Sequence, residues 1–272
     1  MKKNILKIAA KLNITSEQVQ SVVSLLLAGS TIPFIARYRK EVTGSLDEVV
    51  LAAIRDQYDQ LMELDKRREA ILKSIEKQEK LTPALAKAIE AAETLTELED
   101  IYLPYKPKRK TRASMAKEKG LEPLALTIFE QGSVNLEKLI VNFINTELGV
   151  NTADEALEGA RDIMAEWVSE NSEARQKVRE LFWSEGVVET VVVKSKVQDT
   201  EAQKFKDYFE WKEPVKKVPS HRLLAMRRAE KEGYVTMDIA PTEELAVHVL
   251  EKQFVRSGSA AAEQVSLAIK DS

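Results

Sequence analysis

No glycine or proline interrupts the chain between Leu46 and Thr82. Within this stretch, apolar side chains recur at spacings that place them on one face of an α-helix: Val50, Ile54, Tyr58, Leu61, Leu64, Ile71 and Ile75. Ser45 and Glu48 form a capping-box pattern in front of them, with acidic charge beside the positive helix end. We therefore predict one helix from Leu46 to Gln78, about 50 Å long at 1.5 Å per residue.

A helix of this length exceeds the usual helix of a globular protein and indicates a central spine or a coiled-coil arm. It predicts an elongated molecule built on that helix. Arg67, Arg68 and Lys73 are expected on its outer surface, where water solvates them.

The composition favours helices in the rest of the chain as well. The 272 residues include only nine glycines and eight prolines, and 44% of them are hydrophobic, so a mainly all-α fold with a buried core is expected. No cysteine is present, which excludes disulfides and thiolate metal sites. No apolar run approaches the roughly 20 residues that span a bilayer, and the N-terminus lacks a signal-peptide pattern. We predict a cytoplasmic protein without a membrane partner.

The order of helical patterns and breaks predicts four parts: a small N-terminal helical unit (1–44), the spine helix (45–80), a helical domain with a basic loop (81–232), and a short strand with a C-terminal helical segment (233–272). The strand is expected where Tyr234 to Ile239 alternate between apolar and polar residues. Val187 to Val193 is ambiguous, because its β-branched residues favour a strand while propensity alone is a weak guide.

Positive charge is concentrated in the segment from Lys106 to Lys119, which holds seven lysines or arginines and one acid although the formal net charge of the chain is −3. Pro104 and Pro107 prevent a regular helix there and stiffen residues 104–112, which we call the basic loop. A stiff cationic loop loses little entropy when it binds a polyanion, and a tyrosine can stack on a base. The candidate nucleic-acid-binding residues are Tyr105, Lys106, Lys108, Arg109, Lys110 and Arg112. The alternative is a solvated loop whose cations pair with acids elsewhere in the chain.

A second group of cations, Arg37, Arg39 and Lys40, follows the apolar segment that begins at Ile32. These three residues are further candidates for phosphate contact. The residues themselves favour a mainly structural turn, with Phe34 and Ile35 in the core.

No motif of a catalytic site occurs in the sequence. A glycine-rich phosphate loop, an HExxH helix, a GxSxG elbow and EF-hand spacing are all missing, and the two histidines are far apart. We therefore expect no catalytic residue, no metal site, no cofactor and no enzymatic activity.

Five segments in order resemble one protein family. The segments Leu98–Thr111 and Gly120–Ala125 closely resemble the Tex family of bacterial transcription accessory proteins, and Ile32–Gly44, Lys204–Phe209 and Val218–Met226 agree with it. The resemblance implies a multi-helical region with a helix-turn-helix-like portion, and it favours a helix over Val187 to Val193. Tex proteins continue into an inactive RNase H-like domain, a helix-hairpin-helix module and an OB-fold domain, so the chain is expected to be an N-terminal region.

Two functional hypotheses follow. In the first, the chain binds DNA or RNA without sequence preference, through phosphate contacts of the basic loop and of Arg37, Arg39 and Lys40. In the second, it is a scaffold that docks on RNA polymerase or other transcription proteins, or positions downstream domains, without direct contact with nucleic acid. The negative net charge favours the second hypothesis and the local concentration of cations favours the first.

Overall fold

The computed structural model describes residues 2–107, 109–133, 135–256 and 258–272. The chain is mainly α-helical, as predicted, and divides into two compact units that comprise residues 1–105 and 106–272.

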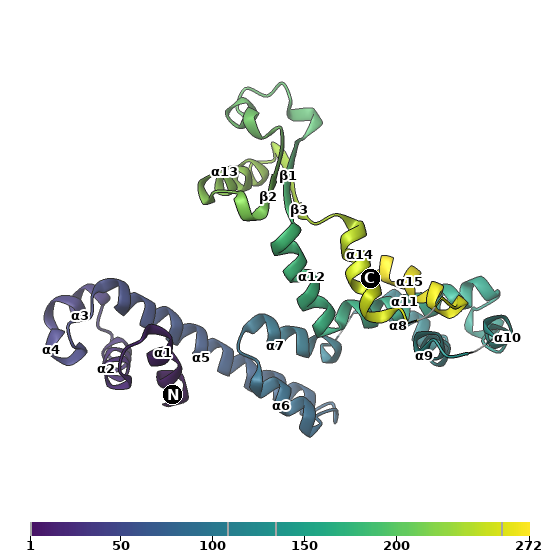
Figure 1. The fold of residues 1–272 in the computed structure, drawn as a ribbon, viewed down its shortest axis with the longest axis horizontal. Coiled ribbons are helices and arrows are strands. Elements are labelled where there is room, and N and C mark those ends of the chain that lie inside the picture. The colour runs from purple at the N-terminus through teal and green to yellow at the C-terminus, as the bar shows by residue number, and fades with distance from the viewer. Residues whose placement is uncertain (1, 108, 134, 257) are drawn as a thin grey trace. The chain divides into compact units, whose positions relative to one another are not determined.

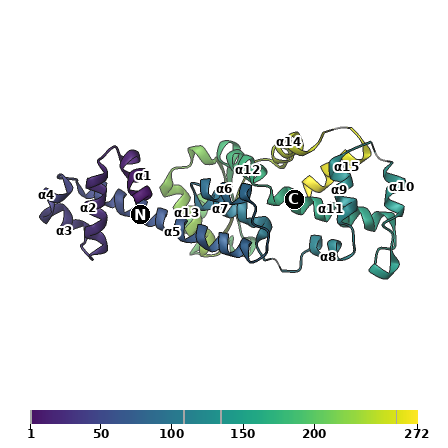
Figure 2. The same cartoon turned by 90° about the horizontal axis from the view of Figure 1, so that it is seen from below.

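The first unit is built on one long helix (Figure 1). Its elements are α1 (Lys2–Leu12), α2 (Ser16–Leu27), α3 (Ile32–Tyr38), α4 (Lys40–Thr43), α5 (Glu48–Glu76), α6 (Pro83–Ala91), α7 (Leu95–Tyr102) and the 3-10 helix η1 (Leu103–Tyr105). The helices α1 to α4 gather around the N-terminal part of α5, where Ile8, Ile35 and Ile54 are fully buried (Figures 1 and 2). The helices α6 and α7 form a second core with the C-terminal part of α5.

The predicted spine helix is confirmed, because α5 is unbroken over a length of about 43 Å. The predicted cap is wrong. Gly44 and Ser45 both adopt left-handed backbone angles that close α4, so Ser45 is turned away from the start of α5. Asp47 caps the helix instead, since its side chain accepts a hydrogen bond from the backbone N–H of Val50 at 2.8 Å.

The second unit has a helical core around α11 (Figure 2). Its helices are α8 (Arg112–Glu118), α9 (Glu122–Glu130), α10 (Leu136–Val141), η2 (Thr146–Leu148), α11 (Ala153–Glu170), α12 (Ser172–Glu185), α14 (Glu243–Phe254) and α15 (Ala260–Lys270). The helices α8, α9 and α15 pack against α11. Ala156, Ala160 and Ile163 are fully buried along it, and these mostly small side chains allow close approach of the neighbouring helices.

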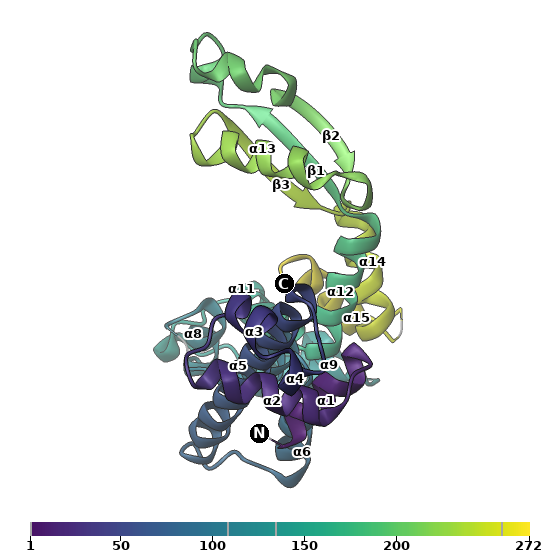
Figure 3. The same cartoon turned by 90° about the vertical axis from the view of Figure 1, so that its left-hand side faces the viewer.

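The second unit also contains a small antiparallel sheet (Figure 3). Its strands are β1 (Val187–Val192), β2 (Glu210–Pro214) and β3 (Val235–Ala240), in the order β2-β1-β3. The helix α13 (Ser220–Lys231) covers one face, and the short 3-10 helices η3 (Lys194–Lys196), η4 (Ala202–Tyr208) and η5 (Val215–Lys217) complete this part. The predicted strand near residues 234–239 is confirmed as β3.

The helix favoured for Val187 to Val193 is wrong, because residues 187–192 form the central strand of the sheet. Burial alternates along β1, with Val188 and Thr190 buried and Glu189 and Val191 exposed. That period of two matches a strand with one face on a core and the other in water. The β-branched residues therefore indicated the structure correctly, and the resemblance did not.

Candidate nucleic-acid interface

The N-terminal end of the basic loop is attached to α5. The hydroxyl groups of Tyr102 and Ser74 lie 2.9 Å apart in a hydrogen bond, and Gln78 donates from Nε2 to the carbonyl oxygen of Tyr105 at 2.9 Å. The Tyr105 ring is half-buried against the core formed by α5, α6 and α7. The basic loop therefore begins at a position fixed on the first unit. Part of the Tyr105 ring is covered by this core, so only the remaining part of the ring can stack on a base.

The C-terminal end of the loop is attached to α11 through Thr111. The hydroxyl oxygen of Thr111 accepts a hydrogen bond from the backbone N–H of Ser114 at 3.0 Å, and the backbone N–H of Thr111 donates to Ser114 Oγ at 2.8 Å. These two hydrogen bonds form a capping box at the start of α8. The same hydroxyl donates to Glu166 Oε1 on α11 at 3.2 Å. Thr111 thus holds the C-terminal end of the basic loop on the second unit, as Gln78 holds Tyr105 on the first unit.

The described cations of the basic loop are all exposed, but they are not equally free. Lys110 Nζ lies 3.4 Å from Glu118 Oε2, and Arg112 Nε lies 3.4 Å from Asp162 Oδ1. Among the described residues, neither Lys106 nor Arg109 has an acidic group within ion-pair distance. Lys108, also predicted as a site residue, lies outside the described residues.

The other cations of this segment have roles within the fold. Lys117 on α8 pairs with Glu166 at 3.0 Å and with Glu122 at 4.0 Å. Lys119 donates to the carbonyl oxygen of Gly149 at 3.1 Å. The local excess of positive charge is therefore partly compensated inside the second unit, as the alternative hypothesis expected.

Asp162, the partner of Arg112, is held in an unfavourable place for a carboxylate. Its side chain is only 16% exposed. Burial raises the pKa of Asp162 above its ordinary value, Glu158 and Asp271 raise it further, and only the charges of Arg112 and Arg161 oppose this. The ion pair with Arg112 is long and is not a strong competitor for a phosphate.

We expect Asp162→Asn to stabilise the chain slightly at neutral pH, by less than about 1 kcal/mol. Because the folded-state pKa is raised, the ionised carboxylate destabilises the fold at high pH, and this cost disappears as the pH falls below the ordinary aspartate range. Urea unfolding at about pH 7 and about pH 4 measures the difference. A variant that is less stable than the parent at neutral pH would show that the ion pair with Arg112 outweighs the cost of burial.

The second predicted cluster lies in the first unit, at α3 and α4. Arg37 and Lys40 are exposed and Arg39 is half-buried, and among the described residues none of the three has an ion pair. Ile35 is fully buried, as predicted, but the prediction for Phe34 is wrong, because its side chain lies on the surface. Ile35 and Ala36 are both buried, and at about 100° per residue Phe34 lies about 150° from the middle of the face that these two form, so it is directed outward.

No arrangement for catalysis or metal binding was found in the described part of the chain. Its His, Asp and Glu side chains form no group of three that could hold a metal ion. Separately, no described helix has both the length and the apolar composition needed to cross a membrane.

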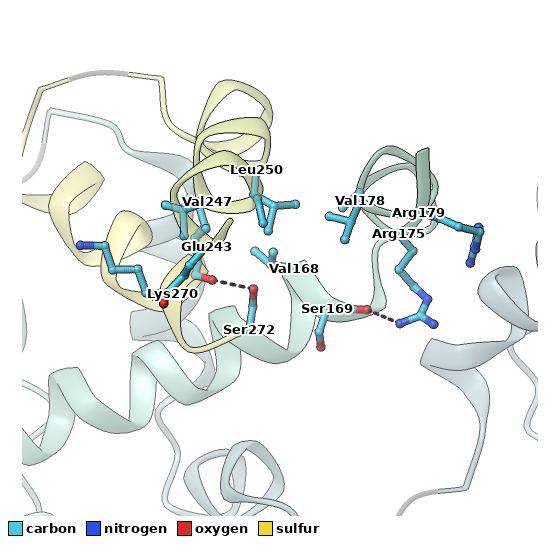
Figure 4. A pocket seen from close by; sticks show the side chains of 13 residues that line it. Val168, Ser169, Arg175, Val178, Arg179, Glu243, Val247, Leu250, Lys270 and Ser272 are labelled. Atoms are coloured by element: carbon cyan, nitrogen blue, oxygen red, sulfur yellow. Dashed lines mark hydrogen bonds between the residues drawn. The ribbon is translucent and has the colours of Figure 1, made fainter. Parts of the chain in front are cut away.

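A cavity of about 420 Å³ lies in the second unit, between α11, α12, α14 and α15 (Figure 4). Val178 and Leu250 line it with apolar surface. Nearby polar groups serve the backbone: Arg175 donates to the carbonyl oxygen of Ser169 at 3.3 Å, and Ser272 Oγ donates to that of Ile269 at 2.7 Å. This cavity does not include any of the predicted site residues.

Two family models match the chain: the Tex-like protein N-terminal domain over residues 2–76 and the Tex central region-like family over residues 131–268. "Protein tex" of Bordetella pertussis is 42% identical over 255 residues, which are 94% of this chain and 32% of that protein. "Transcriptional accessory protein Tex" of Neisseria gonorrhoeae is 43% identical over 230 residues, 85% of this chain and 30% of that protein. The human "S1 RNA-binding domain-containing protein 1" is 26% identical over 238 residues, 85% of this chain and 24% of that protein.

The chain belongs to the Tex family. It spans less than a third of the length of these relatives.

Proposed function

We propose that this chain is a non-catalytic region of a Tex-type transcription accessory factor and that it binds nucleic acid through phosphate contacts, without reading bases. The observation that carries the proposal is the local concentration of cations in the basic loop, with Lys106 and Arg109 exposed and unpaired among the described residues. The relative from Neisseria gonorrhoeae is named a transcriptional accessory protein, and the human relative is named for an RNA-binding domain. Such a factor would act in the cytoplasm, on DNA or RNA.

The number of contacts is limited by the ion pairs. Lys106 and Arg109 can meet phosphates directly. Lys110 must first leave an exposed ion pair, which is worth about 0–1 kcal/mol. Arg112 must leave a pair whose carboxylate, Asp162, is largely buried. Two or three contacts give a log-log salt slope of about −2 to −3 on duplex DNA, at roughly −0.9 per contact. Arg37, Arg39 and Lys40 are proposed as a second contact surface on the first unit.

The test replaces the five cations of the basic loop with alanine: Lys106, Lys108, Arg109, Lys110 and Arg112. We expect the salt slope to become flatter by about 2 to 3, which is the share of the loop contacts, and to keep the share of Arg37, Arg39 and Lys40, because phosphate contacts release counterions and alanine makes none. Binding of labelled duplex DNA and RNA over a salt series measures it. Helical content should be unchanged, since exposed substitutions usually cost less than about 0.5 kcal/mol each.

A control variant removes the same charge from exposed lysines elsewhere: Lys87, Lys138, Lys206, Lys231 and Lys252. The control variant should keep the salt slope of the parent if binding depends on where the positive charge lies. It should lose that slope if binding depends only on the net charge of the chain. If the loop variant binds like the parent at low salt, the basic loop is not a phosphate site.

The second candidate function is a protein scaffold that docks on RNA polymerase or another transcription protein. The pairing of Lys110, Arg112 and Lys117 with acids favours it, because it reduces the charge available to phosphates. In that case the parent chain would bind purified RNA polymerase and would bind neither duplex at low salt.

A further inference from the structure

Two aromatic rings lie side by side on the surface of α3, in the first unit. The side chains of Phe34 and Tyr38 are one helical turn apart, with residue exposures of 39% and 62%. Their ring centroids are 5.4 Å apart, and the ring planes meet at 44°. Between them in sequence, Ile35 and Ala36 are buried in the core around α5. The rings therefore stand on a rigid base, and they leave apolar surface in water that most proteins would bury.

One cation, Arg39, contacts these rings, and two more, Arg37 and Lys40, are close to them in the sequence. The guanidinium carbon of Arg39 lies 5.3 Å from the centroid of Phe34, and Arg39 donates to the carbonyl oxygen of Tyr38 at 3.0 Å. Arg37 and Lys40 are exposed nearby in the chain, and residues 31–40 contain no acid. The arginine covers Phe34, so the more exposed Tyr38 offers the free ring face.

The cations and the exposed ring on α3 together indicate which kind of ligand this surface can bind. Three cations against one nearby acid, the exposed Glu41, give an excess of positive charge that fits a polyanion, and an open aromatic face fits a flat ring. In a duplex the base faces are already stacked on one another, whereas a single strand can present an unpaired base together with its phosphates. We propose that Phe34, Tyr38 and Arg39 form a base-stacking site for single-stranded nucleic acid, with Arg37 and Lys40 at the adjoining phosphates. The inference rests on the proposed nucleic-acid binding and names the form of ligand that α3 takes.

Comparison with the other aromatic candidate supports this assignment. Tyr105 has its ring half-buried against the core of α5, α6 and α7, and Gln78 binds its carbonyl oxygen. Tyr38 has no such packing on its outer face. Base stacking is therefore assigned to α3, while the basic loop makes phosphate contacts only.

The experiment compares three labelled probes on the whole chain: an oligothymidylate of about 12 nucleotides, an abasic strand of the same length, and a duplex of the same length. The first two carry the same phosphates but differ in bases. We expect the parent to bind oligothymidylate at least about fivefold more tightly than the abasic strand, as one stacked base contributes. Tyr38→Ala should remove that preference and leave affinity for the abasic strand and the duplex within about twofold.

Three further variants separate the causes. Tyr38→Phe keeps the ring and should keep the preference. Arg37→Gln should weaken both single strands equally, because it removes a phosphate contact and no ring. Trp183→Ala removes a ring that is 67% exposed on α12, in the second unit, and should change nothing.

Each outcome decides between the proposals. If the parent binds oligothymidylate and the abasic strand equally while the duplex shows a loop-dependent salt slope, the stacking site is wrong and the proposed function stands. If the parent binds none of the three probes, both proposals are wrong. If Tyr38→Ala leaves all three affinities unchanged but abolishes binding to RNA polymerase, the surface on α3 is a protein contact and the inference is overturned.

Discussion

Replacing Arg68 with alanine is expected to lower the free energy of unfolding by about 3 kcal/mol, because this side chain closes the C-terminal end of α6. From α5, Arg68 donates from Nε to the carbonyl oxygen of Ile89 at 3.1 Å and from Nη2 to that of Ala92 at 2.9 Å. These are carbonyls of the last turn of α6 and of its cap, which have no helical donor of their own. A cation there also faces the negative end of the helix.

The size of the effect follows from burial. The Arg68 side chain is 16% exposed, and Ile89 and Ala92 are buried. Leaving two buried carbonyls without a donor costs about 1–3 kcal/mol each, less what water can recover. Arg68 also pairs with Asp65, which accepts from Asn4 at 2.8 Å and so links α1 to α5. The variant therefore weakens contacts between three helices.

Asp65 gives the same prediction a pH dependence. Partial burial raises its pKa, but hydrogen bonds from Asn4 and Arg68 outweigh this and leave the pKa of Asp65 below its ordinary value. A lowered pKa contributes stability above the ordinary aspartate range that is lost as the pH falls through the folded-state pKa. Without Arg68 this contribution is smaller, so the difference between parent and variant should narrow in acid.

Urea unfolding of the full chain measures the loss, and hydrogen exchange of the amides in α6 locates it. Arg55→Ala is the matched control, because Arg55 on the same helix is exposed and, among the described residues, pairs with its neighbour Asp56 alone, at 2.7 Å. It should cost less than about 0.5 kcal/mol. Equal stability of the two variants would mean that the carbonyl contacts of Arg68 contribute nothing net.

Arg68 also shows what the sequence could not reveal. The uninterrupted apolar spacing correctly predicted α5, but Arg67 and Arg68 were expected in solvent. Arg67 instead binds Glu99 on α7, and this hydrogen bond raises the pKa of Arg67 although partial burial opposes it. Periodicity identifies the face of a helix that packs on its neighbours. It does not identify which long charged side chains reach partners that lie far along the chain.

The candidate site was predictable to a similar degree. The concentration of cations in the basic loop was visible in the sequence, and Lys106, Arg109, Lys110 and Arg112 are exposed in the structure. The acids that pair with Arg112 and Lys117 could not be identified from the sequence. These acids, Asp162 and Glu166, lie on α11, about 50 residues away, on the side of that helix that α8 covers. The exposure of Phe34 follows from the joint burial of Ile35 and Ala36, and the sequence alone did not distinguish that face from one formed by Phe34 and Ile35.

Replacing Gly159 with leucine is expected to destabilise the second unit by about 3 kcal/mol, because Gly159 on α11 lies against Leu121 at the start of α9 and against Ala116 on α8. A Cβ atom on Gly159 would overlap Leu121 Cδ1 and would lie 3.3 Å from Ala116 Cβ. Leu121 and Ala116 are themselves buried, so neither can move without disturbing the core. Overpacking of this kind costs about 1–3 kcal/mol for small insertions and more for large ones.

Gly159→Ala tests two opposing effects at this position, the higher helix propensity of alanine and the steric clash of its Cβ atom. Alanine favours a helix over glycine by about 1 kcal/mol, which opposes the clash with Leu121 and leaves a net loss of about 0–2 kcal/mol. Gly132→Ala is the control, since a Cβ there meets no atom within 4 Å. Thermal and urea unfolding should rank the variants as Gly132→Ala, Gly159→Ala and Gly159→Leu, from most to least stable.

The effect should extend to the basic loop, because α8 begins where the loop ends. When α8 is pushed from α11, the hydrogen bond from Thr111 to Glu166 is lost, and with it the anchor of the loop. Gly159→Leu should therefore weaken duplex binding while the salt slope stays near the parent value, since the cations remain but their ordering costs more. Stability equal to that of Gly132→Ala would show that α8 and α11 are not in close contact at Gly159.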